Sequence, residues 1–127
     1  MKRFFKYHFP AIIYALIVFL LSSVPGMKLP KLSILSADKL LHFLEYSLFA
    51  ILIFRSFSDM FRRQKLRLVI IASFFFLFLF AVSDELYQRF IPGRNSDIAD
   101  VLLDILGSSL ILFLLWLRKH RNDQKSR

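Results

Sequence analysis

The hydrophobic positions of this chain fall into four long runs, at about 8–24, 39–57, 67–88 and 97–117. Each run is close to the roughly 20 residues that an α-helix needs to cross the hydrocarbon core of a bilayer. No segment shows the sustained alternation of apolar and polar residues that is typical of a half-buried strand. The pattern therefore predicts an all-α integral membrane protein, a four-helix bundle in which each run is one span.

Residues that break or cap helices mark the ends of these runs. A Pro-Gly pair follows the first run at 25–26, and a second pair precedes the fourth run at 92–93. We expect Ser96 or Asp97 to cap the start of the fourth helix, because short polar side chains accept hydrogen bonds from its first N–H groups. Gly107, inside the fourth run, suits close approach between two helices.

The composition supports a single membrane domain over residues 1–127. Hydrophobic residues make up 57% of the chain, and the mean hydropathy is +0.55. The chain has no cysteine, which excludes disulfides and thiolate metal sites. The basic start and first apolar run resemble a signal peptide. No clear small-x-small cleavage site follows, so we expect an uncleaved first span.

The distribution of charge predicts how the chain sits in the membrane. The net charge is +9, but thirteen of the 18 Lys and Arg residues lie in the segments 2–6, 55–67 and 118–127. Positive charge in short segments outside apolar runs is typical of cytoplasmic loops, so we expect no nucleic-acid partner. The predicted location is the cell membrane, with both termini cytoplasmic and the lipid bilayer as the surrounding partner.

Polar side chains enter three of the runs at the ends predicted to face the exterior. On a helix with 100° per residue, the polar positions of each run lie on one face. An unpaired charge near the membrane centre costs about 2.5–3.5 kcal/mol on insertion scales. We therefore expect these groups to converge in one outward-facing polar pocket. They are Asp38, His42 and Glu45 in the second run, Glu85 and Gln88 in the third, and Asp97, Asp100 and Asp104 in the fourth.

Arg94 is the candidate counter-ion for this pocket. It follows the second Pro-Gly pair, from where it can fold back over Glu85, Asp97 or Asp100 and hold a carboxylate or phosphate through two parallel hydrogen bonds. The same residues also fit a purely structural network that fastens the helices together without a ligand.

Three other charged residues are expected at the edge of the pocket or outside it. Lys39 and Arg89 are better explained as interface residues whose long stems lie against apolar surface. Asp84 lies a third of a turn from Glu85, and we expect it to be solvated.

The order and spacing of the polar residues resemble the VanZ-like family of small bacterial membrane proteins. The motifs are Asp38-Lys39-x-x-His42-x-x-x-Tyr46, then Glu85-x-x-Gln88-x-x-x-Pro92-Gly93-Arg94, then Asp97-x-x-Asp100 with Gly107. The resemblance covers about three of the four runs. It implies a cell-envelope protein, since the family's namesake is associated with lower susceptibility to teicoplanin-type antibiotics. The family usually has Asn at the position of Asp104, so this chain carries one more acid.

Two functions fit these residues. In the first, the pocket binds a lipid head group, a cell-wall precursor or a lipoglycopeptide-type ligand. The predicted ligand-binding residues are Asp38, Lys39, Tyr46, Gln88, Arg94, Asp97, Asp100 and Asp104.

In the second, the protein is an intramembrane hydrolase or transferase acting on a lipid-linked phosphate, with His42 and Glu85 as catalytic residues. His42 would be the general acid or base, oriented by Asp38 or Glu45. A divalent cation is the possible cofactor, with Glu85, Asp97 and Asp100 as candidate ligands. The chain has no nucleophile elbow, His-Glu-x-x-His motif or phosphate loop, so whether it is an enzyme stays open. A proton-coupled carrier is disfavoured because four spans leave little room for a pathway.

Overall fold

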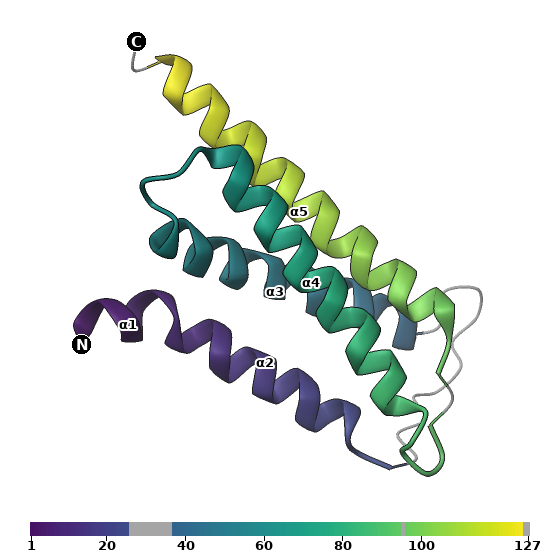
Figure 1. The fold of residues 1–127 in the computed structure, drawn as a ribbon. Coiled ribbons are helices and arrows are strands. Elements are labelled where there is room, and N and C mark those ends of the chain that lie inside the picture. Colours follow the sequence, from purple (N-terminus) through teal and green to yellow (C-terminus); the bar gives the residue numbers. More distant parts are fainter. Residues whose placement is uncertain (26–36, 95, 126–127) are drawn as a thin grey trace.

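A computed structural model describes residues 1–25, 37–94 and 96–125 of the protein, and the side chains within these ranges except those of 37–38 and 123–125. Every regular element in the described residues is an α-helix, which confirms the all-α prediction (Figure 1). The elements are α1 (Lys2–Tyr7), α2 (Phe9–Ser22), α3 (Ala37–Met60), α4 (Leu66–Gln88) and α5 (Ile98–Lys125).

Three of the helices are long and apolar enough to cross a membrane. The candidate spans are Lys39–Met60, Leu66–Gln88 and Ile98–Asn122, in the second, third and fourth predicted runs. The first run differs from its prediction, because the 14-residue α2 ends at Ser22 and a separate α1 precedes it. Pro10 has no N–H to donate to the carbonyl of residue 6, which interrupts the helix at this point. At 1.5 Å per residue, α2 alone is about 21 Å long, less than the roughly 30 Å of a hydrocarbon core.

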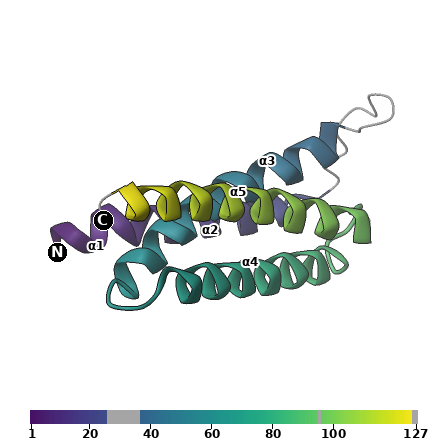
Figure 2. The ribbon, with the colours of Figure 1, turned by 90° about the horizontal axis from the view of Figure 1, so that it is seen from above.

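The helices run alternately up and down, and both termini lie at the same end of the molecule (Figures 1 and 2). The connection from α4 to α5 lies at the opposite end. α3 is the central helix, because it packs against α2, α4 and α5, most extensively against α5. This arrangement brings the C-terminal ends of α2 and α4 together with the N-terminal ends of α3 and α5.

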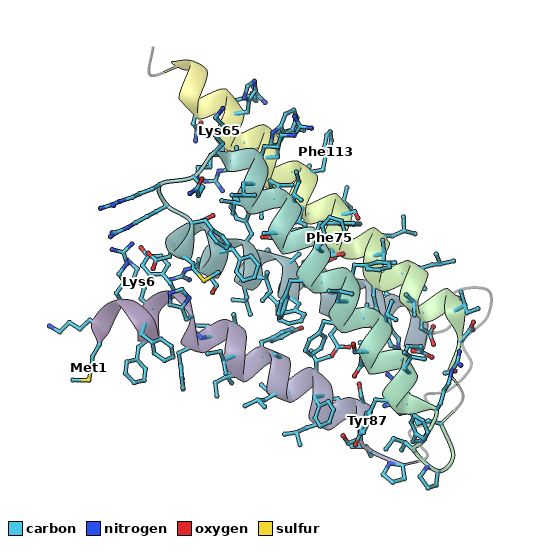
Figure 3. The ribbon with its side chains drawn as sticks, viewed as in Figure 1. Met1, Lys6, Lys65, Phe75, Tyr87 and Phe113 are labelled. Carbon is cyan, nitrogen blue, oxygen red and sulfur yellow. The ribbon has the colours of Figure 1, made fainter. Side chains whose placement is uncertain are left out.

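The apolar core forms around α3, and its outer surroundings are also apolar. Phe49 is fully buried, and its ring contacts those of Tyr14 and Phe80 at centroid distances of 5.5 Å and 5.1 Å. Phe75 of α4 and Phe113 of α5 point away from the bundle, with 58% and 54% of their surface exposed (Figure 3). Large apolar residues on the outer face are what a helix in contact with lipid requires.

Gly107 allows α5 to approach α3 closely. A Cβ atom at this position would overlap the backbone carbonyl oxygen of Phe43 and lie 2.9 Å from Ser47 Oγ. The prediction that Gly107 suits a close helix–helix contact is confirmed.

Candidate functional site

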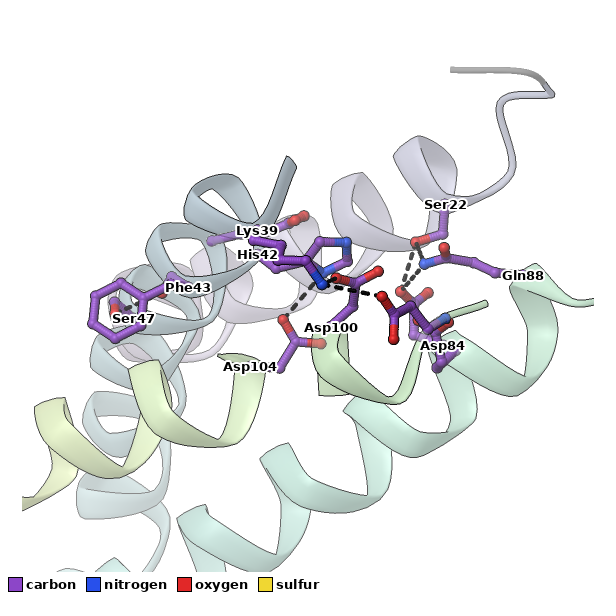
Figure 4. Close-up of polar contacts among 12 residues, drawn as sticks. Ser22, Lys39, His42, Phe43, Ser47, Asp84, Gln88, Asp100 and Asp104 are labelled. Atoms are coloured by element: carbon purple, nitrogen blue, oxygen red, sulfur yellow. Dashed lines mark hydrogen bonds and ion pairs between the residues drawn. The ribbon is translucent and has the colours of Figure 1, made fainter. Parts of the chain in front are cut away.

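Buried polar side chains gather at the end of the bundle opposite the termini. Figure 4 shows polar contacts among several of them. We call this group the polar cluster, and its members expose only 2–9% of their surface. It consists of Ser22 from α2, His42 from α3, Asp84, Glu85 and Gln88 from α4, and Asp100 and Asp104 from α5.

The polar cluster continues the buried stripes of the helices. In α4 the stripe passes from Leu77 and Ala81 to Asp84 and Gln88 at steps of three or four residues. The stripes of α3 and α5 change in the reverse order, since His42 in α3 and Asp100 and Asp104 in α5 precede the apolar part. The spacing that buries the core therefore also buries these polar groups, because each stripe stays on one face of its helix.

His42 and Asp104 form a buried pair between α3 and α5. The distance from His42 Nδ1 to Asp104 Oδ1 is 3.1 Å. Asp38, one of the two residues expected to orient His42, is within α3, but its side chain lies outside the described residues. The extra acid at position 104 is thus a direct partner of the candidate general base.

Lys39 joins the start of α3 to the start of α5. Its Nζ atom lies 3.0 Å from Asp97 Oδ2 and 3.8 Å from Asp100 Oδ1. Lys39 was expected as an interface residue, and its side chain is partly exposed, with its ammonium group placed beside two carboxylates by the packing of α3 on α5. Arg89 bridges the turn after α4, where its Nε atom donates to Ser96 Oγ at 2.9 Å.

Two carboxylates accept hydrogen bonds at the start of α5. Asp97 Oδ1 accepts the Ala99 N–H at 2.9 Å, which confirms Asp97 as the predicted N-cap. The Glu85 carboxylate accepts the N–H of Asp97 itself at 2.5 Å. The hydrogen bond from the Ala99 N–H, followed by that from Lys39, lowers the pKa of Asp97 below its usual range. Glu85 and Asp97 therefore position the helix that carries Asp100 and Asp104.

Asp84 is buried, so the prediction that it is solvated was wrong. Its Oδ2 atom accepts hydrogen bonds from Ser22 Oγ at 2.7 Å and from Gln88 Nε2 at 2.9 Å. The prediction rested only on the angle between Asp84 and Glu85 around their helix. In the structure, α2 packs over the face of α4 that carries Asp84. Ser22 was not predicted as a site residue, because the sequence shows only that it is a polar residue near the end of the first apolar run.

Arg94 holds the end of α2. Its guanidinium donates to Gln88 Oε1 at 2.8 Å and to the carbonyl oxygens of Leu21 at 2.9 Å and Val24 at 3.5 Å. The sequence predicts that Arg94 can fold back over Glu85, Asp97 or Asp100. In the described residues its guanidinium instead donates to Gln88 and to the end of α2. The last carbonyls of a helix have no partner within it, so they attract a nearby guanidinium.

Two polar atoms at the edge of the polar cluster have no hydrogen-bond partner among the described residues. They are the hydroxyl of Tyr46, which is almost fully buried in α3, and Asp84 Oδ1. A buried polar atom without a partner costs about 1–3 kcal/mol, so it points to a bound group or to water.

The described side chains contain no group of three or more His, Asp or Glu residues arranged to hold a metal ion. The candidate ligands Glu85 and Asp97 are engaged at the start of α5 and with Lys39. A divalent cation at Glu85, Asp97 and Asp100 therefore stays a prediction from the sequence.

Comparison with known proteins identifies a family. The family model described as VanZ/LLP1 matches residues 2–119, a range that contains all three motifs and every residue of the polar cluster. No curated protein and no solved structure matches this chain.

Proposed function

Because this chain belongs to the VanZ/LLP1 family, we propose that it is a cell-envelope protein whose polar cluster binds a ligand at the membrane surface. The ligand is the head group of a membrane lipid or of a lipid-linked cell-wall precursor. A lipoglycopeptide with a lipid tail presents similar chemistry, and this is the proposed link to teicoplanin-type antibiotics.

The observation that carries this proposal is the burial of ionisable groups from three apolar helices in one place. Bilayer hydrocarbon offers these groups no hydrogen bonds, so such residues face a protein interior or a wet cavity. Purely structural pairing would satisfy every polar atom. The Tyr46 hydroxyl and Asp84 Oδ1 have no partner in the described part of the chain, which favours a site that receives a further polar group.

The charges of the site fit a ligand that carries both signs. Lys39 and Arg94 lie at its outer edge, where an ammonium and a guanidinium suit a phosphate. Asp84 and Asp104 are deeper, where carboxylates suit an amine or a cation. A phosphate-linked head group with an amine meets both requirements.

We propose that α1 and α2 together make a fourth crossing, with both termini in the cytoplasm. Residues 2–22 continue almost unbroken through His8, whose N–H bonds to Phe4 and whose carbonyl accepts from Ile12. The basic ends of the helices would then lie inside, and the polar cluster would open to the exterior.

Native mass spectrometry of the full-length protein, released from its own membrane, tests the binding function. We expect a lipid phosphate or an amine-containing lipid to remain bound to the wild type. Asp84→Asn and Lys39→Gln should lower the bound fraction about tenfold or more, because each removes a charge from the site. Arg62→Gln, at the opposite end, is the matched control for loss of one charge. Equal lipid retention by all four proteins would contradict the proposal.

The buried pair of His42 and Asp104 favours a second candidate, an intramembrane hydrolase or transferase acting on a lipid-linked phosphate. A histidine oriented by a carboxylate is the usual arrangement of a general base. Incubation with an isoprenoid phosphate, with and without Mg²⁺, should release inorganic phosphate if this function holds. His42→Ala should lower turnover by about 10²–10⁴-fold while the lipid still binds. Binding without turnover in the wild type would favour the binding protein over the enzyme.

A further inference from the structure

A second group of polar side chains lies at the end of the molecule that carries both termini. We call it the His8 network, and it consists of Arg3, His8, Ser56 and Asp59. Ser56 Oγ lies 2.8 Å from His8 Nδ1, and His8 Nε2 lies 3.3 Å from Asp59 Oδ2. Arg3 Nε donates to the two Asp59 oxygens at 2.7 Å and 3.0 Å. The imidazole therefore stands between a hydroxyl and a carboxylate that is itself held in place.

The hydroxyl of Ser56 is directed differently from those of Ser47 and Ser73, which also lie within helices of this chain. Serine within a helix often donates to the carbonyl four residues earlier. Ser47 and Ser73 do so here, bonding to the carbonyls of Phe43 and Val69 at 2.7 Å. Ser56 contacts an imidazole from the other side of a helix–helix contact instead. In a serine nucleophile with its base, the hydroxyl contacts an imidazole that a carboxylate holds in place, as Ser56, His8 and Asp59 do here. Such a group is identified by the geometry and roles of its residues, because their order in the sequence differs between folds.

An apolar groove of about 640 Å³ begins at this network. His8 and Ser56 contribute to its lining, and the rest comes mainly from apolar residues of α2, α3 and α4. On α2 the lining recurs on one face from Ala11 to Phe19, and the same face reaches back to Phe4 on α1. At 1.5 Å per residue, the face from Phe4 to Phe19 is about 23 Å long. Such a groove suits an extended acyl chain with its polar end at His8 and Ser56.

A substrate can approach the network through the groove, because His8 and Ser56 both line it although Ser56 itself is buried. The exposed fraction of the side chain is 25% for His8 and 10% for Asp59. Two further basic residues, Lys6 and Arg55, lie near the network, since both contact the ring of Tyr7, the neighbour of His8. Positive charge beside the network suits an ester whose head group is anionic.

We propose that Ser56, His8 and Asp59 form an acyl-transfer site for the carboxylic ester of a long-chain amphiphile. His8 Nδ1 takes the hydroxyl proton as Ser56 Oγ bonds to the ester carbonyl carbon. The bond from that carbon to the alcohol oxygen then breaks, and the alcohol leaves with the proton from His8. Water from the adjoining aqueous side attacks acyl-Ser56 with His8 again as base, which releases the carboxylic acid and restores the hydroxyl. Asp59 accepts a hydrogen bond from His8 Nε2 and fixes the ring.

Labelling of the full-length protein in detergent micelles with a long-chain alkyl fluorophosphonate tests this proposal. The reagent forms a bond to an activated serine oxygen and expels fluoride, and peptide mass spectrometry identifies the serine. We expect modification at Ser56, about 100-fold slower labelling in His8→Ala, and no modification at this position in Ser56→Ala. Ser58→Ala, two residues along the same helix, is the matched control and should label at the wild-type rate.

Two further measurements separate reactivity from a structural role. Ala15→Phe, which fills the groove, should slow labelling by the long-chain reagent and leave a short-chain reagent unaffected. The wild type should also release the acid from a long-chain p-nitrophenyl ester, and Ser56→Ala should not.

The proposal is overturned if folded wild-type protein is unmodified at Ser56, if His8→Ala and His8→Gln label as fast as wild type, or if no acid is released. Any of these results would show that the network only fastens α1 and α2 to α3. None of these outcomes depends on the polar cluster, which lies at the other end of the bundle.

Discussion

At the scale of single residues, helix caps fix the position of the polar cluster. Asp97 accepts the Ala99 N–H and pairs with Lys39, so one side chain both starts α5 and fastens it to α3. Glu85 supports the same turn from α4 by accepting the N–H of Asp97. A change in the charge of these carboxylates should therefore alter stability as well as the site.

Asp97 gives a pH-dependent prediction with a definite sign. Its pKa is lowered in the folded protein, so its contribution to stability is present above the unfolded value of about 3.9 and is lost as pH falls through the lowered pKa. Asp97→Asn should therefore be less stable than wild type at pH 7, and this difference should shrink below about pH 4. Unfolding in detergent over a pH series measures both proteins. The effect is modest, because the Asp97 side chain is 54% exposed to screening by water.

This prediction is contradicted if the difference in free energy of unfolding between wild type and Asp97→Asn stays constant from pH 7 to pH 3. A constant difference would mean that the carboxylate charge adds nothing to the cap, which the amide of Asn can also form.

At the scale of helices, the contact between α3 and α5 decides whether His42 and Asp104 meet. Gly107 lies three residues after Asp104, and a Cβ there would overlap the carbonyl oxygen of Phe43, the neighbour of His42. In an exposed helix interior, Gly→Ala stabilises by about 1 kcal/mol. At Gly107 the same substitution should destabilise the protein instead, because the added Cβ would overlap a backbone carbonyl, which cannot move aside by changing a rotamer.

Gly107→Ala should therefore destabilise the protein by about 1–3 kcal/mol and weaken any function of the polar cluster. Chemical unfolding in micelles measures the first effect, and the lipid-binding assay measures the second. Leu106→Ala is the control on the outward face of the same helix, since Leu106 is largely exposed. A stabilised Gly107→Ala protein would show that α3 and α5 are not in close contact at this point.

At the scale of the whole molecule, both termini and the α3–α4 connection lie at one end, and the polar cluster lies at the other (Figure 1). Most of the basic residues belong to the first of these ends. Because cytoplasmic segments carry an excess of Lys and Arg, this charge distribution is the basis of the proposed orientation, in which the polar cluster faces the exterior.

A reporter that is active only in the cytoplasm, fused after Arg127, should therefore be active in cells. A reporter that needs export, fused at the same point, should be inactive. The opposite pair of results would show that the topology is inverted, with the polar cluster on the cytoplasmic side. Fusions after Gln64, in the α3–α4 connection, should behave like those after Arg127 and provide an internal control.

The sequence by itself determined three of the long helices and most of the residues of the site. Apolar run length predicted four spans, of which three are long and apolar enough to cross a membrane. The short polar side chain at Asp97 predicted a helix start, and Gly107 predicted a close contact. These features depend on local chemistry, namely hydrogen-bond satisfaction in an apolar solvent and the room left by a missing side chain. The motif spacing was also sufficient to indicate the family.

Only the tertiary structure decided which polar groups meet. His42 pairs with Asp104, 62 positions later, while Ser22 reaches Asp84 and Arg94 reaches the carbonyls at the end of α2. The periodicity of one helix states which residues share a face, but not how far that helix is rotated or shifted against its neighbours. Those two quantities follow from the packing of all the apolar stripes at once, so partners that are distant in sequence are fixed only when the bundle forms.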